Sequence, residues 1–138
     1  MRVEFTKEQF KSLLDLAYLG NWMVNSHRTD DLIEKYDELQ TYLFQHCPRF
    51  EMEELLESLE DGYPSQVYEE EVSEFIDEYD DETLWEGLAM NLATKKVAEE
   101  KVESENALEK IFEYESEYLE EFEANGLKNI SVKMKHRG

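Results

Sequence analysis

The sequence has few of the residues that interrupt or cross-link regular structure: its 138 residues include one cysteine, two prolines and five glycines. The single cysteine, Cys47, cannot form an intramolecular disulfide, which suits a reducing compartment. So few prolines and glycines leave few obligatory turns. The composition therefore favours long helices over a series of short strands.

Long apolar runs are also absent. The longest stretch without a charged residue, Leu16–His27, is too short to cross a bilayer. The first ten residues, MRVEFTKEQF, contain acids and no apolar signal core. We therefore expect a cytoplasmic protein that does not insert into a membrane.

Basic residues are scarce, with 14 Lys and Arg against 35 Asp and Glu and a formal net charge of −21. A chain this acidic repels nucleic-acid phosphates and anionic membrane surfaces, so we expect neither as a partner. The acids are concentrated in Glu51–Glu82, called the acidic segment below, which holds fifteen acids and no Lys or Arg. A charged partner should therefore be basic. The alternative is that the acidity serves only solubility.

What is present suits a helical core. Apolar residues make up 41% of the chain and aromatic residues 12%, which argues against disorder despite the high charge. We find no internal repeat and no second core. The predicted fold is all-α, an irregular bundle of five or six helices in a single domain over residues 1–138. Residues 128–138, with four bases and no acids, form a basic C-terminal tail.

The first two helices have the clearest signals. Thr6 and Gln9 fit a capping box, and apolar residues then recur every three or four positions, which predicts a helix to about Asn25–His27. Thr29 or Asp30 is the predicted cap of the second helix, which Pro48 stops. The short connection makes the two helices antiparallel neighbours.

The remaining elements follow from similar patterns. Helices are predicted over Glu51–Glu60, around Val72–Tyr79, from a cap at Asp80 or Asp81 through Leu92, and over Asn106–Ala124 after a cap at Ser104. A loop is predicted at DGYPS, Asp61–Ser65, and Gly126 should end the last helix with a positive φ. The alternating stretches Val3–Phe5 and Ile130–Met134 would pair as a short two-stranded ribbon, unless the C-terminal stretch is a loose tail.

Specific polar residues collect at the end of the first predicted helix. Tyr18, Asn21, Asn25 and Arg28 share one helix face beside the apolar face. In a structural interpretation, Arg28 pairs with Asp30, Asp31 or a distant Glu, and asparagine caps backbone groups. In a functional interpretation, a cleft holds a ligand or peptide, lined by Tyr18, Trp22, Asn25, His27 and Arg28.

The stretch from Tyr18 to Leu39, YLGNWMVNSHRTDDLIEKYDEL, resembles small acidic bacterial proteins of uncharacterised function. That resemblance implies no activity, and no site is transferred from it.

One acidic pattern suggests metal chemistry. Glu53, Glu54 and Glu57 are followed, after sixteen intervening residues, by Glu74 and Asp77. The pattern resembles the E-E-x-x-E … E-x-x-D motif of all-α nucleoside triphosphate pyrophosphohydrolases, whose facing helices hold Mg²⁺ between carboxylates. In a chain about a quarter acidic, one or two chance matches are expected. The alternative is two solvated helix faces.

Other catalytic patterns are missing. The sequence has no Glu-x-x-His, H-E-x-x-H, C-x-x-C or G-x-S-x-G, and no glycine-rich phosphate loop. The adjacent pair His46–Cys47 would need an electropositive setting to act as a catalytic dyad, and this chain supplies mostly negative potential.

The leading prediction is a non-enzymatic cytoplasmic interaction protein that presents an acidic surface to a basic partner. It needs no cofactor. One alternative is the Mg²⁺-dependent pyrophosphohydrolase. Another is a nucleic-acid mimic, in which carboxylates copy phosphate spacing. The many Tyr and Phe residues also allow a homodimer.

Overall fold

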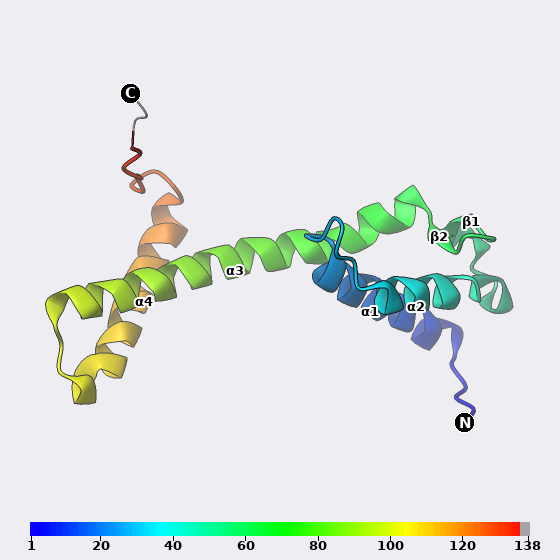
Figure 1. Ribbon diagram of the computed structural model, residues 1–138, viewed down its shortest axis with the longest axis horizontal. Coiled ribbons are helices and arrows are strands. Elements are labelled where there is room, and N and C mark those ends of the chain that lie inside the picture. Colours follow the sequence, from blue (N-terminus) through cyan, green and yellow to red (C-terminus); the bar gives the residue numbers. More distant parts are fainter. Residues whose placement is uncertain (136–138) are drawn as a thin grey trace. The chain divides into compact units, whose positions relative to one another are not determined.

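The computed structural model describes residues 1–135 and is mostly helical, with about 70% of the chain in helices. Its helices and strands are α1 (Lys7–Asn25), α2 (Glu34–Phe44), the 3₁₀ helices η1 (Cys47–Phe50) and η2 (Glu53–Leu55), β1 (Leu56–Ser58), β2 (Tyr63–Pro64), α3 (Gln66–Glu100) and α4 (Ser104–Asn125) (Figure 1). The all-α prediction is confirmed in outline. The helix count was wrong, because residues 1–135 form four α-helices rather than five or six.

The chain divides into two compact units, Met1–Asp77 (unit 1) and Glu78–Gly138 (unit 2), and α3 supplies residues to both. The expectation of one domain over 1–138 stays a prediction.

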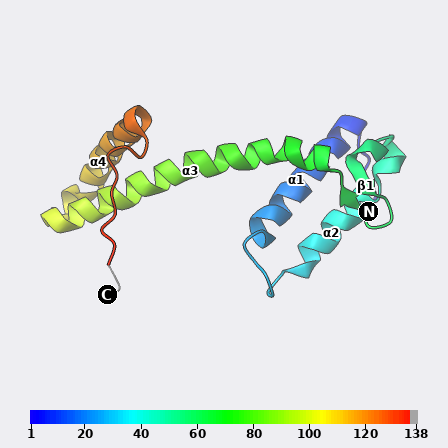
Figure 2. The same ribbon diagram turned by 90° about the horizontal axis from the view of Figure 1, so that it is seen from above.

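Unit 1 begins with the predicted capping box. The Gln9 amide donates to Thr6 Oγ1 at 3.1 Å, and the Thr6 amide donates to Gln9 Oε1 at 3.0 Å, so α1 starts where the sequence indicated. The helices α1 and α2 pack as antiparallel neighbours, as predicted (Figure 2).

The core of unit 1 lies where α1, α2, η1 and the first turns of α3 meet. Seven residues are buried there: Phe10, Leu14, Phe44, Cys47, Met52, Tyr68 and Val72. Phe10 stacks on Phe50 with ring centroids 4.1 Å apart, and the ring of Phe44 meets that of Tyr68 edge-on at 5.2 Å. Large aromatic side chains from distant parts of the sequence therefore stabilise this unit.

The predicted caps of α2 were wrong. Its N-cap is Ile33, which makes no side-chain capping bond, and the helix ends at Phe44, before Pro48. Asp31 Oδ1 instead accepts from the Thr29 amide at 3.3 Å, which closes a separate turn ahead of the helix. A local hydrogen bond of this kind competes with capping.

The stretch Glu51–Glu60, predicted as a helix, instead contains η2, β1 and a turn. Strands β1 and β2 pair antiparallel, with Leu56 opposite Pro64 and Ser58 opposite Tyr63. Gly62 closes the turn with φ +59°, and an added Cβ there would lie 2.5 Å from the carbonyl oxygen of Thr41 on α2. Close packing of this turn against α2 therefore requires glycine.

The predicted terminal ribbon was wrong as well. Val3–Phe5 and Ile130–Met134 contain no strand, and the ribbon in residues 1–135 is the β1–β2 hairpin. Closing a short loop between neighbouring strands costs less chain entropy than bringing the two ends of the chain together. Of the predicted basic tail 128–138, residues 136–138 lie outside the described residues.

Unit 2 is a helical hairpin. The predicted cap at Asp80 or Asp81 does not start a new helix, since α3 runs without a break from Gln66 to Glu100. No glycine or proline stands between Gln66 and Glu86, and an aspartate inside a helix lowers helix propensity without stopping the helix. Lys101, with φ +53°, ends α3, and α4 begins at Ser104 with Glu103 rather than Ser104 as its N-cap.

Aromatic and polar contacts join α3 to α4. Trp85 and Phe122 have ring centroids 5.3 Å apart, and the Tyr114 hydroxyl donates to Glu100 Oε2 at 2.6 Å. The buried apolar residues of the hairpin are Ala89, Ala93, Val97 and Phe122. Gly126 ends α4 with φ +56°, which confirms that prediction.

None of the helices within residues 1–135 is both long enough and apolar enough to cross a membrane.

Candidate functional site

The first candidate site is the corner between α1 and α2, where the sequence predicted either a structural network or a cleft. Its centre is Asn25, which is only 8% exposed. Asn25 Oδ1 accepts from the Ile33 amide at 2.8 Å, and Asn25 Nδ2 donates to the Ile33 carbonyl at 3.2 Å. Asn25 Nδ2 also donates to Asn21 Oδ1 at 2.7 Å. This one side chain therefore satisfies both backbone groups of the residue that precedes α2.

Arg28 closes the other side of the corner. Its Nε donates to the Val24 carbonyl at 2.8 Å, and its guanidinium pairs with Asp31 at 3.0 Å. The guanidinium thus places positive charge at the C-terminal end of α1, where carbonyl groups lack helical partners. The pairing of Arg28 with Asp31 and the capping by asparagine confirm the structural interpretation.

Three of the five predicted cleft residues also line a shallow hollow. Its volume is about 210 Å³, and it is bounded by Tyr18, Asn21, Trp22, Asn25, Ser26 and Gln40. His27 and Arg28 lie outside this lining. Asn21 Nδ2 donates to Gln40 Oε1 at 2.8 Å. These two side-chain amides of the hollow are therefore already hydrogen-bonded to each other. A ligand role for Tyr18, Trp22, Asn25, His27 and Arg28 stays a prediction.

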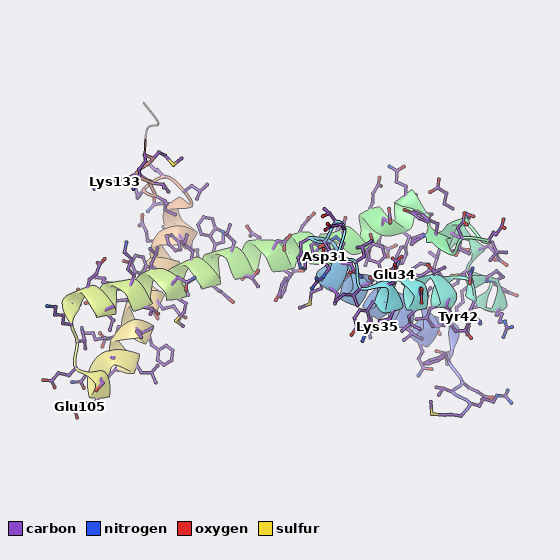
Figure 3. The ribbon with its side chains drawn as sticks, in the orientation of Figure 1. Asp31, Glu34, Lys35, Tyr42, Glu105 and Lys133 are labelled. Atoms are coloured by element: carbon purple, nitrogen blue, oxygen red, sulfur yellow. The ribbon has the colours of Figure 1, made fainter. Side chains whose placement is uncertain are left out.

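Beyond the corner, α2 begins with an acid and a base, Glu34 and Lys35, and continues with the acids Asp37 and Glu38. Figure 3 shows Asp31 in the loop before α2, and Glu34, Lys35 and Tyr42 on α2 itself. Lys35 Nζ lies 5.0 Å from the ring centroid of Tyr36. The start of α2 therefore carries both signs of charge, whereas the acidic segment that follows it in the chain contains no Lys or Arg.

The second candidate site is the acidic segment, Glu51–Glu82. Fourteen of its fifteen acidic side chains are exposed, and Glu69 is partly buried. Within residues 1–135, one ion pair reaches the segment, from Lys11 Nζ to Glu71 at 3.9 Å. Nearly all of these carboxylates thus face solvent without a cation beside them.

The five acids of the alternative metal pattern are spread over different elements. Glu53 and Glu54 lie in η2, Glu57 lies in β1, and Glu74 and Asp77 lie in α3. The expected helix that would place the first three on one face is absent. Among residues 1–135, no group of three His, Cys, Asp or Glu side chains is placed to hold one metal ion.

The pair His46–Cys47 is placed unfavourably for nucleophilic chemistry. Cys47 is fully buried, and burial, followed by the charges of Glu54 and Glu53, raises the pKa of its thiol to about 11. His46 Nδ1 lies 2.8 Å from the Tyr42 carbonyl oxygen. At neutral pH the thiol is therefore protonated and has no access to solvent.

Sequence reasoning missed one polar cluster in unit 1. Asp15 Oδ1 accepts from the Tyr68 hydroxyl at 2.8 Å and from Lys11 Nζ at 3.0 Å, and Lys11 Nζ lies 5.0 Å from the Tyr68 ring centroid. Burial and the bond to Asp15 raise the pKa of Tyr68 far above its ordinary value. The only sequence signal was the i,i+4 spacing of Lys11 and Asp15. The cluster ties α1 to α3 and satisfies a buried hydroxyl.

No protein family, curated protein or solved structure matches the chain.

Proposed function

We propose that the protein is a non-enzymatic cytoplasmic interaction module whose acidic segment binds a basic protein partner. The observation that carries the proposal is the exposure of fourteen of the fifteen carboxylates in Glu51–Glu82, with a single ion pair to the segment within residues 1–135. Like charges that are close together in the chain repel each other, so a cationic partner relieves repulsion as well as gaining attraction. The resemblance of Tyr18–Leu39 to small acidic bacterial proteins stays a prediction and implies no activity.

The test measures binding of a labelled lysine-rich peptide to the full chain by fluorescence anisotropy. The test variant changes Glu53, Glu54, Glu57 and Glu60 to Gln together. Its matched control changes Glu105, Glu109, Glu117 and Glu120 on α4, which are also exposed, so both variants lose the same charge. The first variant should weaken binding about tenfold and the control about twofold, since each surface contact is worth about 1 kcal/mol or less.

Equal weakening by the two variants would mean that net charge alone attracts the peptide, and the acidic segment would lose its assignment. Binding should also fall as salt rises, because exposed charges are screened over a Debye length of about 10 Å at 0.1 M salt. Affinity that is unchanged at high salt contradicts an electrostatic interface. If duplex DNA competes with this protein for the same physiological partner, the acidic segment would act as a nucleic-acid mimic.

A further inference from the structure

The helix α4 carries an apolar stripe that its own unit leaves bare. Leu108, Phe112, Glu115 and Leu119 follow at spacings of four, three and four residues, which places them along one face of the helix. We call these residues the α4 stripe. Leu108 is 63% exposed and Phe112 is 52% exposed. This spacing is typical of residues that pack against another helix, yet two of the three apolar members face solvent.

The hairpin of unit 2 has little core of its own. Two of its four buried apolar residues are alanines, Ala89 and Ala93, whereas the largest fully buried side chains of residues 1–135 all belong to unit 1. Two helices bury only the stripes that face each other. An exposed apolar stripe on such a hairpin is the kind of surface that another amphipathic helix covers.

Glu115 indicates what that helix should carry. It occupies the third position of the otherwise apolar stripe and is partly buried. Its Oε2 is buried and has no hydrogen-bond partner among residues 1–135. A buried carboxylate oxygen without a donor is costly, and a lysine or arginine side chain supplies both a donor and a positive charge.

The surrounding charge favours the same kind of partner. From Glu78 to Leu127 the chain has sixteen acids and four bases. A second copy of the hairpin would bring two strongly negative surfaces together, whereas a basic helix reduces the repulsion. Charge complementarity therefore selects a basic helix over self-association.

We propose that the α4 stripe binds a basic amphipathic helix of a partner protein, which covers Leu108 and Phe112 and directs a cation to Glu115. The stripe shares no residue with the acidic segment. This inference therefore does not depend on the function proposed above, and either can fail alone.

The probe is a labelled synthetic peptide of roughly 21 residues, about the length of α4. It has leucines at alternating spacings of three and four and lysines elsewhere, and its binding to the full chain is measured by fluorescence anisotropy. Leu108→Ala and Phe112→Ala should each weaken binding about fivefold or more. The matched control, Val67→Ala, removes an apolar side chain that is 74% exposed on α3, and should change binding less than about twofold.

The charge arm compares Glu115→Gln with Glu117→Gln, which removes the same charge from an exposed position on the same helix. Glu115→Gln should weaken binding several-fold more than Glu117→Gln. The Gln variants at positions 53, 54, 57 and 60 used above should weaken this leucine-containing peptide less than Phe112→Ala does. Circular dichroism should show unchanged helix content in every variant.

Three results would overturn the inference. One is equal binding of a peptide with serines in place of the leucines, which would leave only general electrostatic attraction. Another is equal weakening by Glu115→Gln and Glu117→Gln. The last is a stable dimer in sedimentation analysis that Phe112→Ala dissociates, because a second copy would then cover the stripe.

Discussion

At the scale of single residues, the corner between α1 and α2 depends on a side chain that the sequence marked without assigning its role. Asn25 lies at the last position of α1 and reaches across the loop to both backbone groups of Ile33. An amide suits this task because it has a donor and an acceptor on one planar group. The same engagement leaves Asn25 with little free capacity for a ligand.

Replacement of Asn25 by Ala should destabilise unit 1. The change leaves the amide and carbonyl of Ile33 without their partner, and loss of a buried partner costs about 1–3 kcal/mol. Urea denaturation followed by circular dichroism measures the effect. Asn91→Ala, at an exposed position of α3, is the control and should be neutral or slightly stabilising. If the two variants unfold at the same urea concentration, the hydrogen bonds of Asn25 do not stabilise the loop between α1 and α2.

Cys47 gives a pH-dependent prediction. Its folded-state pKa of about 11 lies above the ordinary thiol value of about 8.5, so the folded state disfavours the thiolate. The stability associated with the neutral thiol is therefore fully present below about pH 8.5 and is lost as pH rises toward 11. Cys47→Ala should flatten the fall in unfolding free energy between pH 8.5 and pH 10. It should also lower stability at pH 7, because it removes packing atoms.

Thiol reactivity checks the same assignment independently. In native protein at pH 8, Cys47 should react with a thiol reagent far more slowly than in urea, because the thiol is buried and protonated. Rapid labelling of the native chain would show that the thiol is accessible, contrary to its burial.

At the scale of elements, local signals were reliable where one helix end carried its own cap. Thr6 and Gln9 predicted the start of α1, and Gly126 predicted the end of α4, because each signal acts through backbone groups a few residues away. Glu51–Glu60 misled the prediction, since its apolar residues also fit a helix. There the chain forms η2 and β1. In the turn that follows β1, the Glu60 carbonyl accepts a hydrogen bond from Gln45, the C-cap residue of α2. A contact with an element outside the segment decided its conformation.

The turn at Gly62 gives a matched pair of substitutions. Gly62→Ala forces a Cβ to within 2.5 Å of the Thr41 carbonyl oxygen at a positive φ, so it should destabilise unit 1 by about 1 kcal/mol or more. Gly20→Ala, on α1 with nothing within 4 Å of the new Cβ, should stabilise by about 0.5–1 kcal/mol. The midpoint of thermal unfolding should therefore fall for Gly62→Ala and rise for Gly20→Ala. A shift in the same direction would contradict the close approach of the turn to α2.

At the scale of the whole molecule, the dominant quantity is the net charge of −21. Residues 1–135 contain six ion pairs, three of them between neighbours on one helix, and exposed pairs of that kind contribute little. Mutual repulsion of the acids therefore opposes the compact state.

Salt should stabilise the fold. Raising NaCl from about 0.01 M to about 1 M shortens the Debye length from about 30 Å to about 3 Å and screens the repulsion. The midpoint of thermal unfolding should rise over this range. The variant with Gln at positions 105, 109, 117 and 120 should gain less from salt, because it begins with fewer charges. A midpoint that falls with salt would show that ion pairs outweigh repulsion.

The sequence by itself determined the helical class, the start of α1, the end of α4 and the surplus of surface carboxylates. These features depend on apolar periodicity, caps and composition, which act locally or add over the chain. Only the tertiary structure decided that Glu51–Glu60 is not a helix and that Asp15 accepts hydrogen bonds from both Tyr68 and Lys11. These outcomes depend on free energies of packing between segments far apart in the chain, which no local pattern encodes.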